Sequence, residues 1–238
     1  MAIKVVMSIR GYLNITVVLL CILLKSQLNS QDMRVSIYSS ILGKNDVKQV
    51  YKDLVHKALS DFGCANPEKV AVKRMNSLGS LIAGVQISSF TAFGIWLDEE
   101  YLDACTIEQQ TFQIYHEAAH YVKNHHSKLL AKLLGLVAVN VFIVHCLQSK
   151  SSQNHLGQVA KVCCMLFALL GSGKLVSCIV KNQEKEADIC AAKRLNRLGE
   201  SDVVNAYIQD LYSLTGNDSL WWYAPLEQVL YLKDSDNE

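Results

Sequence analysis

The segment TIEQQTFQIYHEAAHYVKNHH, residues 106–126, is predicted to form one helix with two histidines on the same face. Thr106 is a favourable N-cap, and Gln109 three residues later completes a capping box. Glu108 lies in the first turn, where a negative charge favours the positive end of the helix dipole. The sequence therefore predicts both the helix and the hydrogen bonds that begin it.

The pattern His-Glu-x-x-His occupies positions 116–120 of this helix. Because residues four apart lie one above the other, His116 and His120 can both contact one metal ion. Glu117 is about 100° further round the helix, beside the open coordination position of a catalytic zinc. Zinc lowers the pKa of a bound water, and Glu117 is predicted to act as the general base when that water attacks a peptide carbonyl. The pattern also arises by chance, and the helix would then carry only two surface histidines.

A catalytic zinc needs a third protein ligand, which the segment EKEAD at 184–188 can supply. Glu184 and Asp188 share one face of a helix, so Glu184 is predicted to be the third ligand. Asp188 is predicted to hydrogen-bond the second nitrogen of a ligating histidine. Glu186 points about 200° away and is expected to be a solvated charge. The alternative is an ordinary amphipathic helix with charges four residues apart.

The rest of the chain predicts an α+β fold that is mainly helical. Only two prolines occur in 238 residues, which favours long uninterrupted helices. Segments rich in β-branched and aromatic residues predict a small antiparallel sheet. Two apolar stretches joined by a polar loop predict a hydrophobic helical hairpin at about 129–180. The expected elements are helices at 45–62, 106–126, 183–198 and 201–216, strands at 70–72, 81–87 and 93–97, and apolar hairpin segments at 133–149 and 162–180.

Residues 1–30 are predicted to be a signal peptide or an uncleaved N-terminal membrane anchor. Lys4 and Arg10 precede an uncharged run, 11–24, that is too short for a full transmembrane helix. Residues 31–238 would then form one domain, whose hairpin crosses the membrane, lies in its interface or is buried in protein. The basic N-terminal flank predicts an extracytoplasmic domain, whereas the lysines beside the hairpin favour the opposite orientation.

Charge and cysteine content exclude several classes of function. The net charge is +1, with 23 basic and 22 acidic side chains and no long block of like charge, so no nucleic-acid partner is predicted. The eight cysteines include no C-x-x-C pair. Neither a disulfide scaffold nor a thiolate zinc site is therefore predicted. The two histidines that follow the metal-binding pattern, His125 and His126, are expected only to favour the negative end of the helix dipole. No oligomeric state is predicted.

The sequence HEAAH, followed by an apolar hairpin and then EKEAD, resembles the HtpX-type, CAAX-prenyl-protease-type and Oma-type gluzincins over roughly residues 77–199. The resemblance implies a zincin-like metallopeptidase core that holds one zinc ion per chain. It also implies endopeptidase activity towards unfolded or membrane-associated polypeptides. In this family an edge strand binds extended substrate, and residues 81–89 are the expected counterpart here.

The chain departs from that family near its C-terminus. Many members carry a histidine there that stabilises the tetrahedral intermediate, whereas this chain has WWYAP at 221–225 and no histidine after His155. Tyr223 is the candidate replacement donor. The departure motivates an alternative function, a catalytically weak or inactive zinc-binding membrane scaffold of the same fold. A second alternative is a helical membrane protein in which the His-Glu-x-x-His pattern is coincidental.

Overall fold

The computed structural model describes residues 45–75, 88–91, 94–149, 155–214 and 232 of the 238-residue chain. Three sequence predictions fall outside this part of the chain. They are the N-terminal targeting segment at 1–30, the strand at 81–87 and the candidate donor Tyr223.

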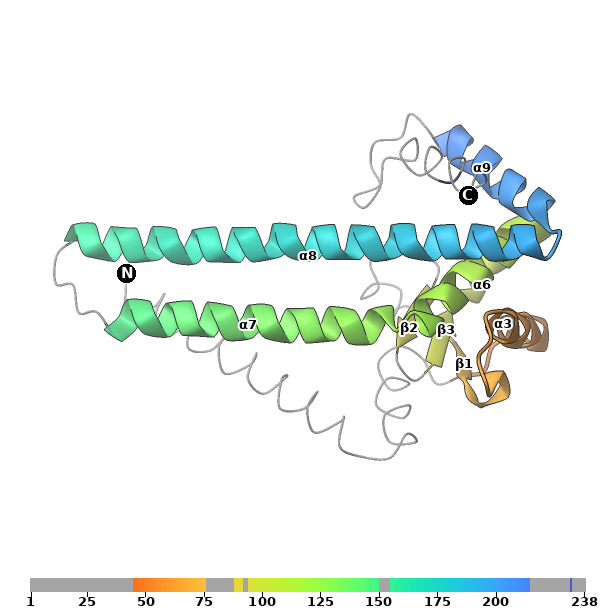
Figure 1. Ribbon diagram of the computed structural model, residues 1–238, viewed down its shortest axis with the longest axis horizontal. Coiled ribbons are helices and arrows are strands. Elements are labelled where there is room, and N and C mark those ends of the chain that lie inside the picture. The colour runs from red at the N-terminus through yellow and green to blue at the C-terminus, as the bar shows by residue number, and fades with distance from the viewer. Residues whose placement is uncertain (1–44, 76–87, 92–93, 150–154, 215–231, 233–238) are drawn as a thin grey trace.

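The fold is mainly helical with one small sheet, as predicted (Figure 1). Helices α3, α6 and α9 and the sheet gather at one end of the molecule, and two long antiparallel helices, α7 and α8, extend away from it. The described elements are α3 (Gln49–Asp61), η1 (Pro67–Lys69), β1 (Ala71–Arg74), β2 (Ser88–Thr91), β3 (Gly94–Leu97), α5 (Glu99–Ala104), α6 (Ile107–Val122), α7 (His125–Ser149), α8 (His155–Arg197) and α9 (Ser201–Leu214).

The sheet is mixed, which corrects the prediction of an antiparallel one. Its order is β1-β3-β2, with β2 antiparallel to β3 but β1 parallel to β3. Gly94 pairs with Ala71, and a Cβ atom at position 94 would lie 2.6 Å from the Ala71 carbonyl oxygen. Glycine is therefore needed for the two backbones to approach at this point.

Helix α6 is the centre of the core. Its side chains Phe112, Ile114 and Tyr115 are fully buried. Phe112 stacks on Tyr207 of α9 with ring centroids 3.8 Å apart. Because α3, α8 and α9 all pack on α6, burial of its apolar side chains holds the helix that carries His116 and His120 in place.

The capping box at the start of α6 is formed as predicted. The Gln109 backbone N–H donates to Thr106 Oγ1 over 3.3 Å, and the Thr106 N–H donates to Gln109 Oε1 over 2.9 Å. At the other end, α6 stops at Val122, and Asn124 adopts a left-handed conformation with φ of 55°. This turn reverses the chain into α7, so the predicted helix at 106–126 is interrupted before its last residues.

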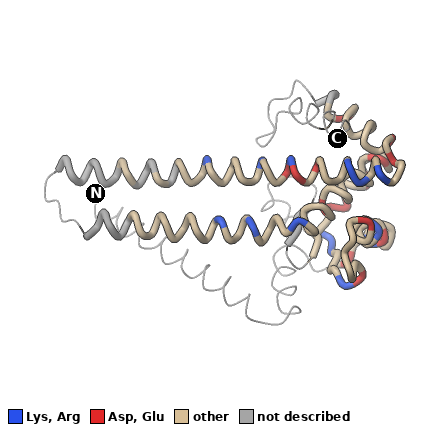
Figure 2. Tube along the Cα trace, viewed as in Figure 1, with Lys and Arg blue, Asp and Glu red and all other residues tan. Residues whose placement is uncertain are grey.

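The predicted apolar hairpin consists of α7 and the first part of α8. Helix α8 is continuous over 43 residues, so the apolar segment and the acidic segment at 184–188 share one helix of about 65 Å. Figure 2 shows that most of the described charged residues gather at the compact end of the molecule. Along α7 beyond Lys132 the exposed side chains that the structure describes are apolar, with Val139 55% and Phe142 67% exposed, whereas Lys128 and Lys132 are exposed nearer its start. Among the described residues, one stretch, His125–Ile143, is long and apolar enough to cross a bilayer.

Candidate metal centre

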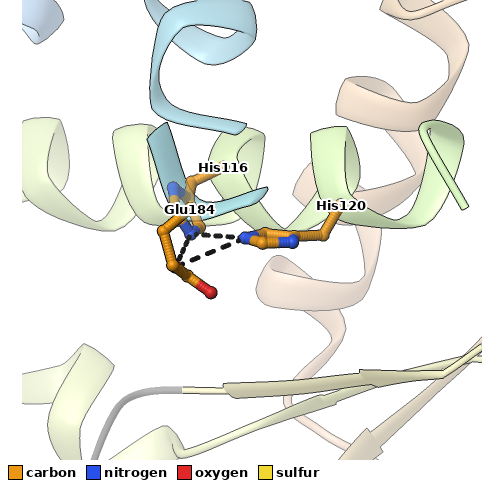
Figure 3. A group of neighbouring side chains, drawn as sticks. All are labelled: His116, His120 and Glu184. Atoms are coloured by element: carbon orange, nitrogen blue, oxygen red, sulfur yellow. Dashed lines mark hydrogen bonds and ion pairs between the residues drawn. The ribbon is translucent and has the colours of Figure 1, made fainter. Parts of the chain in front are cut away.

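Three of the predicted site residues meet where α8 crosses α6. His116 and His120 come from α6 and Glu184 from α8, and one possible ligand atom of each lies within 4.8 Å of the others (Figure 3). Glu184 Oε2 is 3.2 Å from His116 Nε2 and 3.4 Å from His120 Nε2. Two imidazole nitrogens and one carboxylate oxygen therefore converge on one point, as a zinc site requires.

The approach of the two helices depends on small buried residues. Ala118 and Ala119 on α6, and Ala187 and Ala191 on α8, are at most 1% exposed. Small buried side chains on both helices are compatible with their close packing, and Glu184 reaches both histidines. The ligand group is consequently sheltered: His120 is 1% exposed, and the Glu184 side chain 28%.

Asp188 is hydrogen-bonded to His116, as the sequence predicts. His116 Nδ1 lies 2.6 Å from Asp188 Oδ1, and Asp188 is fully buried. A proton on Nδ1 leaves the lone pair of Nε2 directed towards Glu184. Burial disfavours a charged His116, but the carboxylates of Asp188 and Glu184 outweigh it and raise the His116 pKa well above its usual value.

Glu184 is held in its anionic form. Burial alone would raise its pKa, but hydrogen bonds from His116 and His120 lower the pKa well below the usual range for a glutamate. A deprotonated carboxylate beside two imidazoles is a donor set that suits a divalent cation such as zinc.

Glu117 lies beside this donor set and is buried. Its Oε1 is 3.9 Å from His116 Nε2, and its side chain is 9% exposed. Its Oε2 is buried with no hydrogen-bond partner in the described part of the molecule. A buried carboxylate oxygen without a partner is costly. The orphan oxygen next to two imidazoles therefore fits a centre that is completed by a bound cation and its solvent.

His125 also belongs to the site, contrary to the sequence prediction, and it contacts Glu186, which is an exposed charge as predicted. His125 is fully buried, and its Nδ1 lies 2.9 Å from His120 Nδ1. Glu186 is 45% exposed but its Oε2 lies 3.2 Å from His125 Nε2, and its Oε1 is 3.3 Å from Lys123 Nζ. Burial opposes the anionic form of Glu186, but Lys123 and His125 lower its pKa. His125 is thus a buried contact of His120, and not merely a residue that favours the negative end of a helix dipole.

A signal for His125 was present in the sequence. An asparagine directly before it, Asn124, tolerates the left-handed conformation that ends a helix. If α6 ends at this asparagine, the chain turns back, and His125 then lies close to the last turn of α6, which carries His120.

Comparison with known proteins identifies one family. The family model described as Peptidase family M48 matches residues 44–213, which cover α3 to α9 and all the residues of the site described above. No curated protein and no solved structure matches the chain.

Proposed function

This chain belongs to peptidase family M48, and we propose that it is a zinc metalloendopeptidase that cleaves unfolded or membrane-associated polypeptides. The observation that carries the proposal is the convergence of His116, His120 and Glu184 beside the orphan carboxylate oxygen of Glu117. Family membership supports a protease, and the donor set supports one zinc ion per chain.

In the proposed centre, the imidazoles of His116 and His120 and the carboxylate of Glu184 would hold the zinc ion. Zinc, when bound, supplies a Lewis acid that acidifies water and polarises a peptide carbonyl. Glu117 accepts the proton of the attacking water and then delivers it to the departing amide nitrogen. Asp188 keeps the Nδ1 proton on His116 and so fixes the tautomer in which Nε2 is free to bind. Tyr223 remains the proposed donor to the oxyanion.

The sheet offers a place for an extended substrate. Within the described residues β2 lies at one edge of the sheet, where it pairs with β3, and it also packs against α6. We propose that the substrate backbone adds to this edge, at a position that overlaps the predicted segment 81–89.

The hairpin is proposed to hold the enzyme at a membrane. Beyond Lys132 its described exposed side chains along α7, among them Val139 and Phe142, are apolar, and a large exposed apolar surface marks a contact with lipid or with another protein. Residues 1–30 are proposed to supply a second membrane or export signal. That the domain is extracytoplasmic stays a prediction.

One observation favours the scaffold alternative, in which zinc is bound but catalysis is weak or absent. No histidine follows His155, so the donor expected near the C-terminus of this family is missing. Loss of one oxyanion donor typically costs about 10²–10³ in rate. A scaffold would bind zinc in the same centre and cleave substrates weakly or not at all.

The distinguishing experiment is the substitution Glu117→Gln. The amide cannot take a proton, so casein cleavage is expected to fall by about 10²–10⁴ while zinc content stays at the wild-type level. Glu108→Gln, on the exposed first turn of the same helix, is the matched control and should cleave normally. Cleavage by Glu117→Gln at the wild-type rate would overturn the proposed mechanism. Zinc-loaded wild type that cleaves no substrate would favour the scaffold.

A further inference from the structure

We infer that His125 is a positioning residue for the metal centre, which connects the Glu186 carboxylate to His120 and fixes the orientation and tautomer of that ligand. The inference rests on the proposed zinc site. It concerns a residue that belongs neither to the His-Glu-x-x-His pattern nor to the predicted pair Glu184 and Asp188.

A continuous chain of contacts leads from the metal centre to the surface. His120 Nε2 faces Glu184, and its other nitrogen, Nδ1, lies 2.9 Å from His125 Nδ1. His125 Nε2 lies 3.2 Å from Glu186 Oε2. The rings of His120 and His125 meet edge to face, with centroids 4.8 Å apart and an interplanar angle of 82°. Both ring nitrogens of His120 and of His125 therefore take part in this chain of contacts.

Only one arrangement of protons satisfies this chain when zinc is bound. A ligating His120 uses the lone pair of Nε2, so its single proton is on Nδ1. That proton is donated to His125 Nδ1, which must therefore be an unprotonated acceptor. The remaining proton of a neutral His125 is on Nε2 and is donated to Glu186. A doubly protonated His125 would place two N–H groups against each other and disrupt the chain.

The backbone around His125 is held in place by several contacts. Asn124 has the one positive φ among the described non-glycine residues, and this strained turn brings His125 back towards His120. Gln183, next to the ligand Glu184, donates its side-chain N–H to the His125 carbonyl over 3.0 Å, and Gln183 is itself buried. Helix α8 thus anchors His125 through both its backbone and its ring.

Each ligating histidine then has its own carboxylate on α8. His116 contacts Asp188 directly, whereas His120 reaches Glu186 through His125. Outer partners of this kind typically change metal affinity by 10–100-fold when they are removed. Glu186 is half exposed and paired with Lys123. Its own removal should therefore cost less than removal of His125.

The test compares His125→Leu with His125→Asn in the full-length protein. The asparagine Oδ1 can occupy the place of Nδ1 and accept the His120 proton, whereas leucine fills the space without an acceptor. We expect His125→Leu to weaken zinc binding by about 10–100-fold and His125→Asn to weaken it less. Competition with a chromophoric chelator measures the zinc affinity without any activity assay. His56→Leu, a histidine of α3 that contacts the Val70 carbonyl oxygen, is the matched control.

A role in packing alone predicts the reverse order, because leucine tolerates a buried position better than asparagine. A smaller loss in His125→Leu than in His125→Asn would therefore overturn the inference, as would zinc affinity of His125→Leu within twofold of wild type. Glu186→Gln is expected to weaken binding in the wild-type background but to have no further effect in His125→Asn, whose side chain is too short to reach position 186. An equal Glu186→Gln effect in both backgrounds would also contradict the chain of contacts.

A second measurement needs no variant. In zinc-loaded wild type, nitrogen-15 spectra of labelled histidine side chains should place the proton of His125 on Nε2 and that of His120 on Nδ1. A proton on Nδ1 of His125 would overturn the inference even if the variants fail to fold. If wild type binds zinc but substitution of His125 leaves the zinc affinity unchanged, the inference fails and the proposed function stands. If wild type binds no zinc, the proposed function fails and the inference with it.

Discussion

At the scale of the residue, the His116–Asp188 pair is a buried charged contact within the site. Asp188 has no exposed surface, and the 2.6 Å contact joins it to a histidine that is itself buried. An unpaired carboxylate in that position would be costly. The pair therefore stabilises both the fold and the tautomer that the metal needs.

This pair leads to a prediction for the metal-free protein. Burial opposes charge on His116, but Asp188 and Glu184 raise its folded pKa above 6.5. A raised histidine pKa contributes stability that is fully present below pH 6.5 and is lost as the pH rises through the folded pKa. Asp188→Asn should therefore lower the free energy of unfolding more at about pH 5.5 than at about pH 8.5. Denaturant unfolding of chelator-treated wild type and mutant checks this, and a pH-independent loss would contradict it.

The sequence was sufficient for the residues that obey helical spacing. His116 with His120, and Glu184 with Asp188, are each four apart, so one helix face could be assigned to each pair. His125 and Glu186 were not predictable in this way. Their contact depends on the left-handed turn at Asn124 and on the angle at which α8 crosses α6, neither of which follows from periodicity.

At the scale of the element, α6 determines where the ligands lie, and its start is fixed by the Thr106 capping box. The N-cap and the first turn were predictable because they depend on a short local pattern. The parallel pairing of β1 with β3 was not, because it is a contact between distant segments that Gly94 permits by its lack of a side chain. The joining of the apolar and acidic segments into one α8 was also missed.

The cap gives a measurable stability effect. Thr106→Ala removes the side-chain acceptor for the Gln109 N–H and is expected to lower the free energy of unfolding by about 1 kcal/mol. Thr106→Ser keeps the hydroxyl and should remain within a few tenths of a kcal/mol of wild type. Unfolding curves of the three proteins test the contribution. Equal stability of the alanine and serine variants would show that the cap does not contribute.

At the scale of the whole molecule, the separation of a charged compact end from an apolar hairpin suggests two environments (Figure 2). The proposed metal centre lies at the base of the hairpin, where α6 meets α8. A hairpin in contact with lipid would hold this centre close to the membrane surface. Polypeptide substrates that emerge from the membrane would then be close to this centre.

Membrane contact can be tested at one exposed position of α7. The variant Phe142→Trp places an indole where 67% of the native side chain is exposed. Its added fluorescence should be quenched in vesicles whose acyl chains carry bromine, because the hairpin is expected to contact the hydrocarbon. The matched control is Ile107→Trp, at a 75% exposed position of the compact end, which should not be quenched. Absence of quenching at position 142 would contradict the proposed membrane contact.

The most direct test of the metal centre is elemental analysis of purified wild type, Glu184→Ala and the exposed control Glu68→Ala. We expect about one zinc per chain in wild type and in the control, because three protein ligands are the norm for a catalytic zinc. Glu184→Ala should hold little or no zinc, since only His116 and His120 remain. Wild type without zinc, or Glu184→Ala with as much zinc as wild type, would contradict the proposed centre.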